Sequence, residues 1–292
     1  MASQSSRTAP APPAVLAIQC AADSTSGCAS PTAQARPTQA ISGKSGDVTV
    51  RSVTIHANPS SDPVNPGHNT DACDVSGTNI LIENCNVSVG DDNFTCGGGT
   101  SGVLITNCTY GYGHGVSIGS YTHNGGVSNL TVINCTFNNT ESGIRIKTDR
   151  DRGGLVRNIS YLNLRMTNVG FPILVYAAYT NSNRAYRALA KLTPALAAAY
   201  PSAPIAYRTP IYRDLTFSNI TATVAPGGCA GLIWGLPEMN VTTVLLQQVK
   251  ITADRPFAIY NAKNVRLVDS KIITPDGVAP WVSTNAEISF AP

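Results

Sequence analysis

The tetrapeptide Ile82-Glu83-Asn84-Cys85 recurs as Ile105-Thr106-Asn107-Cys108 and again as Val132-Ile133-Asn134-Cys135. In each copy, alternating apolar residues are followed by a short polar residue and then by another brief strand-like segment. Five looser copies of the phrase occur on both sides of these three. They are Val50-Arg51-Ser52-Val53, Tyr161-Leu162-Asn163-Leu164, Phe217-Ser218-Asn219-Ile220, Leu246-Gln247-Gln248-Val249 and Leu267-Val268-Asp269-Ser270.

The spacing of these copies indicates a repeat fold. Successive copies lie 21 to 32 residues apart, except for one gap of 56 residues between Tyr161 and Phe217. Each repeat holds two or three β-type segments separated by Gly or Asn, and it lacks the helical periodicity of ankyrin or tetratricopeptide repeats and the leucine-rich consensus. Coils of parallel strands that stack about 4.8 Å apart fit this pattern. The sequence therefore predicts an all-β, single-stranded solenoid, the parallel β-helix, with the recurrent Asn residues as an internal ladder at a turn.

The first part of the chain does not follow the repeat. Residues 1–45 are rich in Ala, Ser, Thr, Pro and Gln and have no periodicity, so we interpret them as a leader or a disordered arm. The β-helix is then expected to span residues 46–292. A basic residue, a short apolar stretch and two small residues in the arm weakly resemble a secretory signal peptide. These are Arg7, Pro13 to Ile18, Ala21 and Ala22.

A second departure is the double-length gap, which contains the Ala- and Leu-rich residues 184–200. The helical propensity of this stretch predicts a short helical insertion on a loop beside the strands. A net charge of +3, with scattered Lys and Arg, argues against a nucleic-acid groove. Apolar runs stay well short of the roughly 20 residues that cross a bilayer. We expect a monomer that binds neither nucleic acid nor membrane.

The cysteines and the repeated asparagines each allow two interpretations. Five of the eight cysteines fall in the strand-rich middle, without a CxxC pair or a zinc-type spacing, so we predict buried small apolar residues rather than disulfides. Asn107, Asn134 and Asn219 lie in glycosylation sequons. Because they recur at one phase of the repeat, a structural ladder is favoured over glycosylation.

Counting from the cysteines of the repeat brings together residues of separate coils. Asp91 lies six residues after Cys85, and His114 lies six residues after Cys108. Neighbouring coils therefore present the carboxyl group and the imidazole at the same position. Gly90 offers a bend that would let both Asp91 and the next residue face one side.

Four more charged residues extend this cluster over four successive coils. Asp92 follows directly, Asp71 lies on the preceding coil, and Arg145 and Lys147 alternate on the coil after His114, so that both face one side of their strand. Glycosidic cleavage needs a protonated acid beside a carboxylate that activates water, and crowded like charges raise the pKa of one carboxyl group. The two cations suit a uronic-acid carboxylate. The cluster therefore predicts cleavage of an acidic polysaccharide.

Clustered aspartates also suit calcium, and a structural salt-bridge ladder would use the same residue types. Adjacent Arg and Lys side chains argue against a high-affinity cation site. We therefore expect the site to need no metal and no other cofactor.

The charged residues lie in four motifs in a fixed order: Asn69-Thr70-Asp71, Gly90-Asp91-Asp92, Gly113-His114-Gly115 and Arg145-Ile146-Lys147. Together these motifs resemble the signature of glycoside hydrolase family 28, the polygalacturonases. The resemblance covers roughly Gly46 to the C-terminus. It implies a right-handed parallel β-helix, a secreted or periplasmic location, and hydrolysis of galacturonan or rhamnogalacturonan with inversion.

The resemblance also implies residue roles. Asp91 would be the general acid, Asp71 and Asp92 would activate water, and His114 would maintain the protonation state of the acid. The implied substrate-binding residues are Asn69, Arg145, Lys147 and a tyrosine, which is matched by Tyr179 with Tyr176 as a competing match.

The stereochemistry sets two arguments against each other. Stacking at about 4.8 Å predicts carboxyl groups within roughly 5 Å of each other, a separation associated with retention. The resemblance implies inversion. A water held between Asp71 and Asp92, off the line that joins the closest pair, reconciles the two, and we therefore expect inversion.

Two departures from the family pattern keep alternatives open. The usual continuation after the Asp pair is replaced by Asn93-Phe94-Thr95-Cys96-Gly97, and Gly46 to His68 with the arm stands where several coils and a capping helix are usual. A shortened, non-catalytic β-helix that binds polysaccharide is one alternative. A pectate lyase, which would need calcium, is another. The choice between exo and endo cleavage also stays open.

Overall fold

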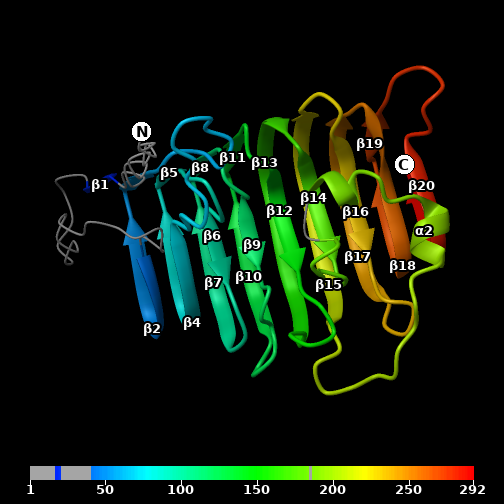
Figure 1. Cartoon of the computed structure of the whole chain (residues 1–292), viewed down its shortest axis with the longest axis horizontal. Coiled ribbons are helices and arrows are strands. Elements are labelled where there is room, and N and C mark those ends of the chain that lie inside the picture. Colours follow the sequence, from blue (N-terminus) through cyan, green and yellow to red (C-terminus); the bar gives the residue numbers. More distant parts are fainter. Residues whose placement is uncertain (1–16, 21–40, 184–185) are drawn as a thin grey trace, which may run out of the picture.

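The protein is a parallel β-helix, seen in a computed structural model that describes residues 17–20, 41–183 and 186–292 (Figure 1). Every strand pairing from β2 onward is parallel, and each coil stacks on the one before it. The predicted all-β solenoid is therefore confirmed. The strands form three stacks along the length of the molecule.

Two of these stacks carry the repeated phrase and the segment that follows it. The first contains β2 (Ile41–Arg51), β4 (Cys73–Glu83), β7 (Thr100–Thr106), β10 (Val127–Ile133), β13 (Leu155–Val169), β15 (Ile211–Val224), β17 (Val241–Thr252) and the C-terminal ends of β18 (Arg255–Val268) and β20 (Trp281–Ala291). The second contains β3 (Val53–His56), β5 (Asn86–Ser88), β8 (Thr109–Gly111), β11 (Thr136–Asn138), the C-terminal ends of β13, β15 and β17, and β19 (Lys271–Ile273).

The third stack carries the charged motifs, and we call it the site sheet. It consists of the N-terminal ends of β2 and β4, then β6 (Phe94–Cys96), β9 (Val116–Ile118), β12 (Ser142–Lys147), β14 (Phe171–Tyr176), β16 (Cys229–Trp234) and the N-terminal ends of β18 and β20.

The N-terminal region contributes two strands. β1 (Ala17–Cys20) pairs with β3 in antiparallel fashion, and β2 begins at Ile41 rather than at the expected boundary, Gly46. Most of the signal-like stretch, including Arg7, lies outside the described residues.

The recurrent asparagines form a ladder, but on the outside of the coil rather than the inside as expected. Asn134, Asn163 and Asn219 are exposed and have positive φ angles, a conformation that Asn tolerates well. The Asn163 amide donates to Asn134 Oδ1 at 2.5 Å, and that of Asn219 donates to Asn163 Oδ1 at 3.0 Å. The left-handed turn directs the Asn side chain to solvent and leaves the next residue facing inward.

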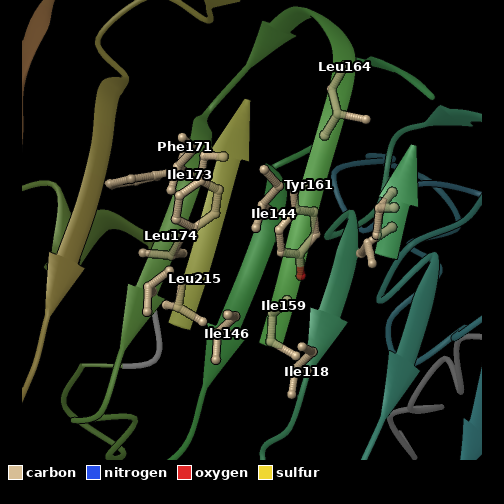
Figure 2. Close-up of a cluster of buried hydrophobic side chains, with 14 of the residues drawn as sticks. Ile118, Ile144, Ile146, Ile159, Tyr161, Leu164, Phe171, Ile173, Leu174 and Leu215 are labelled. Carbon is tan, nitrogen blue, oxygen red and sulfur yellow. The ribbon is translucent and has the colours of Figure 1, made fainter. Parts of the chain in front are cut away.

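That next residue builds the internal ladder. Cys85, Cys108 and Cys135 stack inside the coil, where the backbone N–H of Cys85 points to Cys108 Sγ at 3.5 Å and that of Cys108 to Cys135 Sγ at 3.4 Å. All six cysteines of the described chain whose side chains are placed are free and buried, as predicted. Inward-facing aliphatic and aromatic side chains fill the rest of the core, and Figure 2 shows Ile144 of the site sheet and Tyr161 of the first stack among them.

The predicted helical insertion is present as two short helices, α1 (Tyr186–Leu189) and α2 (Pro194–Ala198). Thr193 caps α2, since its Oγ1 accepts from the backbone N–H of Leu196 at 3.2 Å, and Pro194 occupies the first helical position. Within the described residues, neither helix is long enough to cross a membrane.

Candidate active site

The predicted charged residues converge where three coils enter the site sheet. Asp71 lies two residues before β4, Asp92 two residues before β6 with Asp91 next to it, and His114 two residues before β9. Backbone hydrogen bonds join these entry loops: His114 N donates to Asp91 O at 2.8 Å, and Ala72 N donates to Asp92 O at 3.0 Å. The registry counted from the cysteines therefore corresponds to real neighbours in space.

Gly90 lies at a bend, as predicted, and close packing at this point also requires glycine. A Cβ at Gly90 would lie 2.1 Å from the carbonyl oxygen of Gly67, so a side chain there would push two coils apart. The close approach of these backbones holds the entry loops of Asp71 and Asp91 against each other.

Asp92 is the buried centre of the charge network. Lys147 Nζ donates to Asp92 Oδ2 at 2.8 Å, and Arg145 Nη1 donates to Asp92 Oδ1 at 3.1 Å. Ser117 Oγ donates to the same Oδ1 at 2.6 Å. Burial favours the neutral acid, but the charges of Lys147, Arg145 and His114 outweigh it and lower the pKa of Asp92. Asp92 is therefore an ionised carboxylate.

His114 lies between two further carboxyl groups. Its Nδ1 lies 2.9 Å from Asp91 Oδ1, at an angle short of a well-aligned hydrogen bond, and its Nε2 lies 3.1 Å from Glu141 Oε2. Burial and the Arg145 charge oppose protonation of His114, yet the contacts with Asp91 and Glu141 prevail and raise its pKa. Burial also opposes ionisation of Asp91, but His114, Lys147 and Arg145 hold the pKa of Asp91 well below its usual range.

Asp71 is the carboxyl group that retains a proton. Burial, the negative charges of Asp91 and Asp92, and a hydrogen bond with the Asp91 side chain raise the pKa of Asp71 to about 7. The backbone N–H of Asp92 donates to Asp71 Oδ1 at 3.1 Å and to Asp91 Oδ1 at 2.9 Å. The two carboxyl groups share this backbone donor, and the raised pKa lets Asp71 keep its proton at pH values below about 7.

Both cations of the fourth motif are buried, but Lys147 lines the groove, whereas Arg145 lies beneath aromatic rings. Arg145 is 3% exposed, and its guanidinium carbon lies 5.9 Å from the ring centre of Tyr179 and 5.3 Å from that of Tyr186. Lys147 Nζ lies 5.5 Å from the Tyr179 ring centre and reaches the groove. Tyr176, the competing match for the family tyrosine, is fully buried, whereas Tyr179 lines the groove.

An open groove runs over these residues. Its floor is carboxylate-rich, with one cation and two aromatic rings at its edge. The lining includes Asn69, Asp71, Asp74, Ser76, Asp91, Asp92, Thr95, Ser120, Tyr121, Lys147 and Tyr179.

Four residues that interact with the charged cluster were not predicted from the sequence. Ser117 pairs in register with Arg145 and Thr95, so counting two residues on from Gly115 finds it. Glu141 and Asp74 are acidic residues close to known motifs, a weak signal. Tyr186 carries no sequence signal, because the insertion brings it to the site from outside the repeat.

The cluster also contains a possible cation site. Ligand atoms of Asp91, Asp92 and His114 lie within 4.8 Å of one another. Both oxygens of Asp92 already contact cationic groups, those of Lys147 and Arg145, and their positive charges oppose a metal ion there. The donor set therefore fits a metal poorly.

The fold and the site together define a parallel β-helix that presents a cluster of carboxyl groups in an open groove. Residues 3–193 match the model of the glycosyl hydrolases family 28, and the chain belongs to this family.

Several named relatives are similar to part of the chain. It is 30% identical to the endo-polygalacturonase of Pectobacterium carotovorum subsp. carotovorum over 199 residues, which cover 66% of this chain and 43% of the relative. It is 33% identical to an exopolygalacturonase of Zea mays over 216 residues, covering 71% of this chain and 46% of the relative. The chain thus spans less than half of the length of each of these two relatives.

Two solved structures share the fold. The family 28 exopolygalacturonase of Yersinia enterocolitica superposes with a TM-score of 0.59 at 19% identity, covering 77% of this chain and 39% of that one. A hyperthermoactive exopolygalacturonase from Thermotoga maritima superposes with a TM-score of 0.53 at 20% identity, covering 80% and 49%. At these identities the likeness establishes the β-helix.

Proposed function

We propose that the chain hydrolyses glycosidic bonds in pectic polysaccharide, of the galacturonan or rhamnogalacturonan type. The observation that carries the proposal is the asymmetric trio of carboxyl groups. Asp92 is ionised by its two cations, whereas Asp71 and Asp91 share a proton in the groove. Acid and base are thus available in one place, as glycosidic cleavage requires.

In this proposal Asp91 is the general acid, and Asp71 and Asp92 activate the attacking water. The residues of the site place the proton on Asp71, because His114, Lys147 and Arg145 favour the ionised form of Asp91. A substrate carboxylate that pairs with Lys147 would offset part of that positive charge. The pKa of Asp91 would then rise, and the shared proton would move from Asp71 to Asp91.

The same transfer leaves Asp71 ionised beside Asp92, which is the state needed to accept a proton from water. His114 stabilises the arrangement from the other side through its contacts with Asp91 and Glu141. Asp91 and Asp92 present carboxyl oxygens within 4.8 Å of each other. We propose inversion despite this short separation, because the water is held by the third carboxyl group, Asp71, and the separation rule was framed for two groups.

The substrate contacts are divided between residues of the groove rim. We propose that Lys147 binds a sugar carboxylate directly and that Tyr179 and Asn69 hold the sugar ring and its hydroxyl groups. Arg145 acts from below, through Asp92 and the two tyrosine rings that cover it. We further propose that the protein acts as a monomer in a secreted or periplasmic location, because its polymeric substrate lies outside the cell.

A panel of pectic polymers tests the proposal. Polygalacturonate, methyl-esterified pectin, rhamnogalacturonan and xylogalacturonan are incubated with the protein, and new reducing ends are measured together with ultraviolet absorbance. The proposal predicts reducing ends on a galacturonate-containing polymer, without the absorbance of unsaturated products. Unsaturated products would identify a lyase. If a correctly folded sample cleaved none of the polymers, the alternative of a non-catalytic β-helix that binds polysaccharide would be favoured.

A further inference from the structure

The outer face of the site sheet changes character at one strand. In strand register, outward residues run from Asp74 through Thr95 and Ser117 to Arg145, and all of these are polar. The same row continues with Leu174, Leu232 and Ala258, all apolar. The neighbouring row changes in the same place, from Lys147 to Tyr176, Trp234 and Tyr260.

The apolar half of this face is covered by residues 186–208, which we call the insertion segment. Leu189 belongs to the hydrophobic core, Ala190 and Leu192 pack against it, and all three line a small cavity together with Leu232 and Tyr260 of the sheet. The ring centre of Tyr200 lies 5.1 Å from that of Trp234, edge to face, and α2 packs on β18 and β20. Figure 1 shows the segment passing in front of β14, β16 and β18 to reach α2 beside β20.

Hydrogen bonds and ring contacts hold the insertion segment next to the charged residues of the site. Arg150, three residues beyond Lys147, donates through Nη2 to the carbonyl oxygen of Pro201 at 2.7 Å. The same guanidinium pairs with Glu238 at 2.6 and 2.9 Å and lies 5.1 Å from the Tyr200 ring centre. At the other end, Tyr186 covers Arg145 and lies against His114, with ring centres 5.6 Å apart. The cover therefore begins directly beside the cluster.

We propose that the insertion segment ends the substrate groove immediately beyond Lys147 and Tyr179, so that the site cuts a fixed short piece from one end of its polymer. The inference rests on the proposed function and specifies its mode of action. The groove lining draws on β4, β6 and β12 and on loops beside the strands, whereas Leu174, Leu232 and Trp234 of the next two strands are no more than 2% exposed.

The size of the piece follows from the spacing of the strands. Lys147 is the last charged residue of its row, and Tyr176, on the adjacent strand about 4.8 Å away, is already covered. That step is comparable to the length of one sugar unit. Because Lys147 Nζ lies 2.8 Å from Asp92 Oδ2, the sugar that Lys147 binds adjoins the bond that is cut. One sugar, or at most two, therefore fits between that bond and the wall that the insertion segment forms.

Product analysis of the complete chain tests this inference. Oligogalacturonides of defined length, labelled at the reducing end in one set and at the non-reducing end in another, are digested and sampled from the earliest time points. We expect a mono- or disaccharide from the start, carrying the label in one set only, while the viscosity of the polymer falls slowly. Total reducing ends are recorded in the same samples.

The outcomes separate the two claims. Products of many intermediate sizes, with a rapid fall of viscosity, would show that the insertion segment does not end the groove. The proposed hydrolase activity would still hold. Failure to cleave any oligomer or polymer would remove the proposed function, and the inference with it.

Loosening the wall supplies the second arm of the test. Arg150→Ala removes the fastening to Pro201, Glu238 and Tyr200 without altering the carboxyl cluster, and Tyr200→Ala removes the cover over Trp234. Both should raise the share of products longer than a disaccharide several-fold. Arg213→Ala, which removes an ion pair with Asp214 on β15, is the matched control and should leave the product sizes unchanged. An unchanged product pattern in folded Arg150→Ala and Tyr200→Ala would show that the limit on product length lies elsewhere.

Discussion

The two halves of the site sheet share one backbone geometry and differ in what their outward side chains contact. Around β6, β9 and β12, the outward side chains converge on Asp92, whose two oxygens receive contacts from Lys147, Arg145 and Ser117. Around β14, β16 and β18, equivalent positions hold apolar side chains that the insertion segment covers. Parallel coils thus fix where a side chain stands, and the residue type at each step decides between chemistry and packing.

The largest difference is expected from one substitution in each half. Asp91→Asn keeps the shape of the side chain but removes its acid, so hydrolysis should fall on the order of a thousandfold or more in protein that remains folded. Leu232→Ala opens a cavity under the insertion segment and should cost about 2–5 kcal/mol of unfolding free energy. Reducing-sugar release per folded molecule should change little in Leu232→Ala.

Kinetics and urea unfolding of both variants check this contrast. Near-normal turnover in folded Asp91→Asn would show that Asp91 is not the general acid. A thousandfold loss of hydrolysis in folded Leu232→Ala would show that the apolar half of the sheet also contributes to the chemistry, and the division into two halves would be wrong.

The two cations of the charged half should respond differently to substrate charge. Lys147→Ala removes a groove cation, so activity on de-esterified polymer should fall about tenfold to a hundredfold more than activity on a fully methyl-esterified polymer. Arg145→Ala leaves Asp92 with one cation fewer in a buried position, and its loss should be similar on both polymers. Steady-state rates on the two polymers give the comparison. Equal losses of activity on the two polymers in Lys147→Ala would show that Lys147 stabilises Asp92 rather than binding the substrate carboxylate.

Stability should report the proton on Asp71. Its folded pKa of about 7 lies above the value in the unfolded chain, so its contribution is present at low pH and is lost as pH rises through about 7. Asp71→Asn imitates the neutral acid and should gain stability relative to the natural chain between about pH 4 and pH 8, on the order of 2 kcal/mol after allowance for partial exposure.

Urea unfolding across this pH range is the measurement, with the exposed Asp276→Asn as control. A stability difference that stays constant with pH would place the proton on another group.

Much of the molecule was predictable from the sequence because residues at equivalent positions of successive repeats lie next to each other in the structure. Copies such as Ile105-Thr106-Asn107-Cys108 predicted the coils, and the equal distances from Cys85 to Asp91 and from Cys108 to His114 predicted neighbours that the structure confirms. The asparagine ladder was expected inside and lies outside, since a turn residue with positive φ directs its side chain to solvent.

Contacts that arise outside the repeat were not predictable in this way. Tyr186 reaches Arg145 and His114 from the insertion, whose path depends on the apolar surface beneath it. Likewise, Arg145 and Lys147 alternate on one strand and were expected to play the same part. Their different parts follow from Tyr186, which covers Arg145, whereas Lys147 lines the groove and Tyr179 contacts both cations.

The smallest effect is expected from chelation. Because Lys147 and Arg145 already neutralise Asp92, EDTA should leave the hydrolysis rate unchanged, and added calcium should not raise it. Rates with and without chelator on the preferred polymer suffice. Strong inhibition that calcium reverses would place a metal among the carboxylates and favour a lyase.

The most direct test of the account is the configuration of the first product. Three carboxyl groups, with a water held between Asp71 and Asp92 while Asp91 donates the proton, predict a single displacement. Proton NMR spectra recorded within the first moments of oligogalacturonide cleavage, before mutarotation, should therefore show the inverted anomer. A retained anomer, or a trapped glycosyl-aspartate, would contradict this division of roles among the three aspartates.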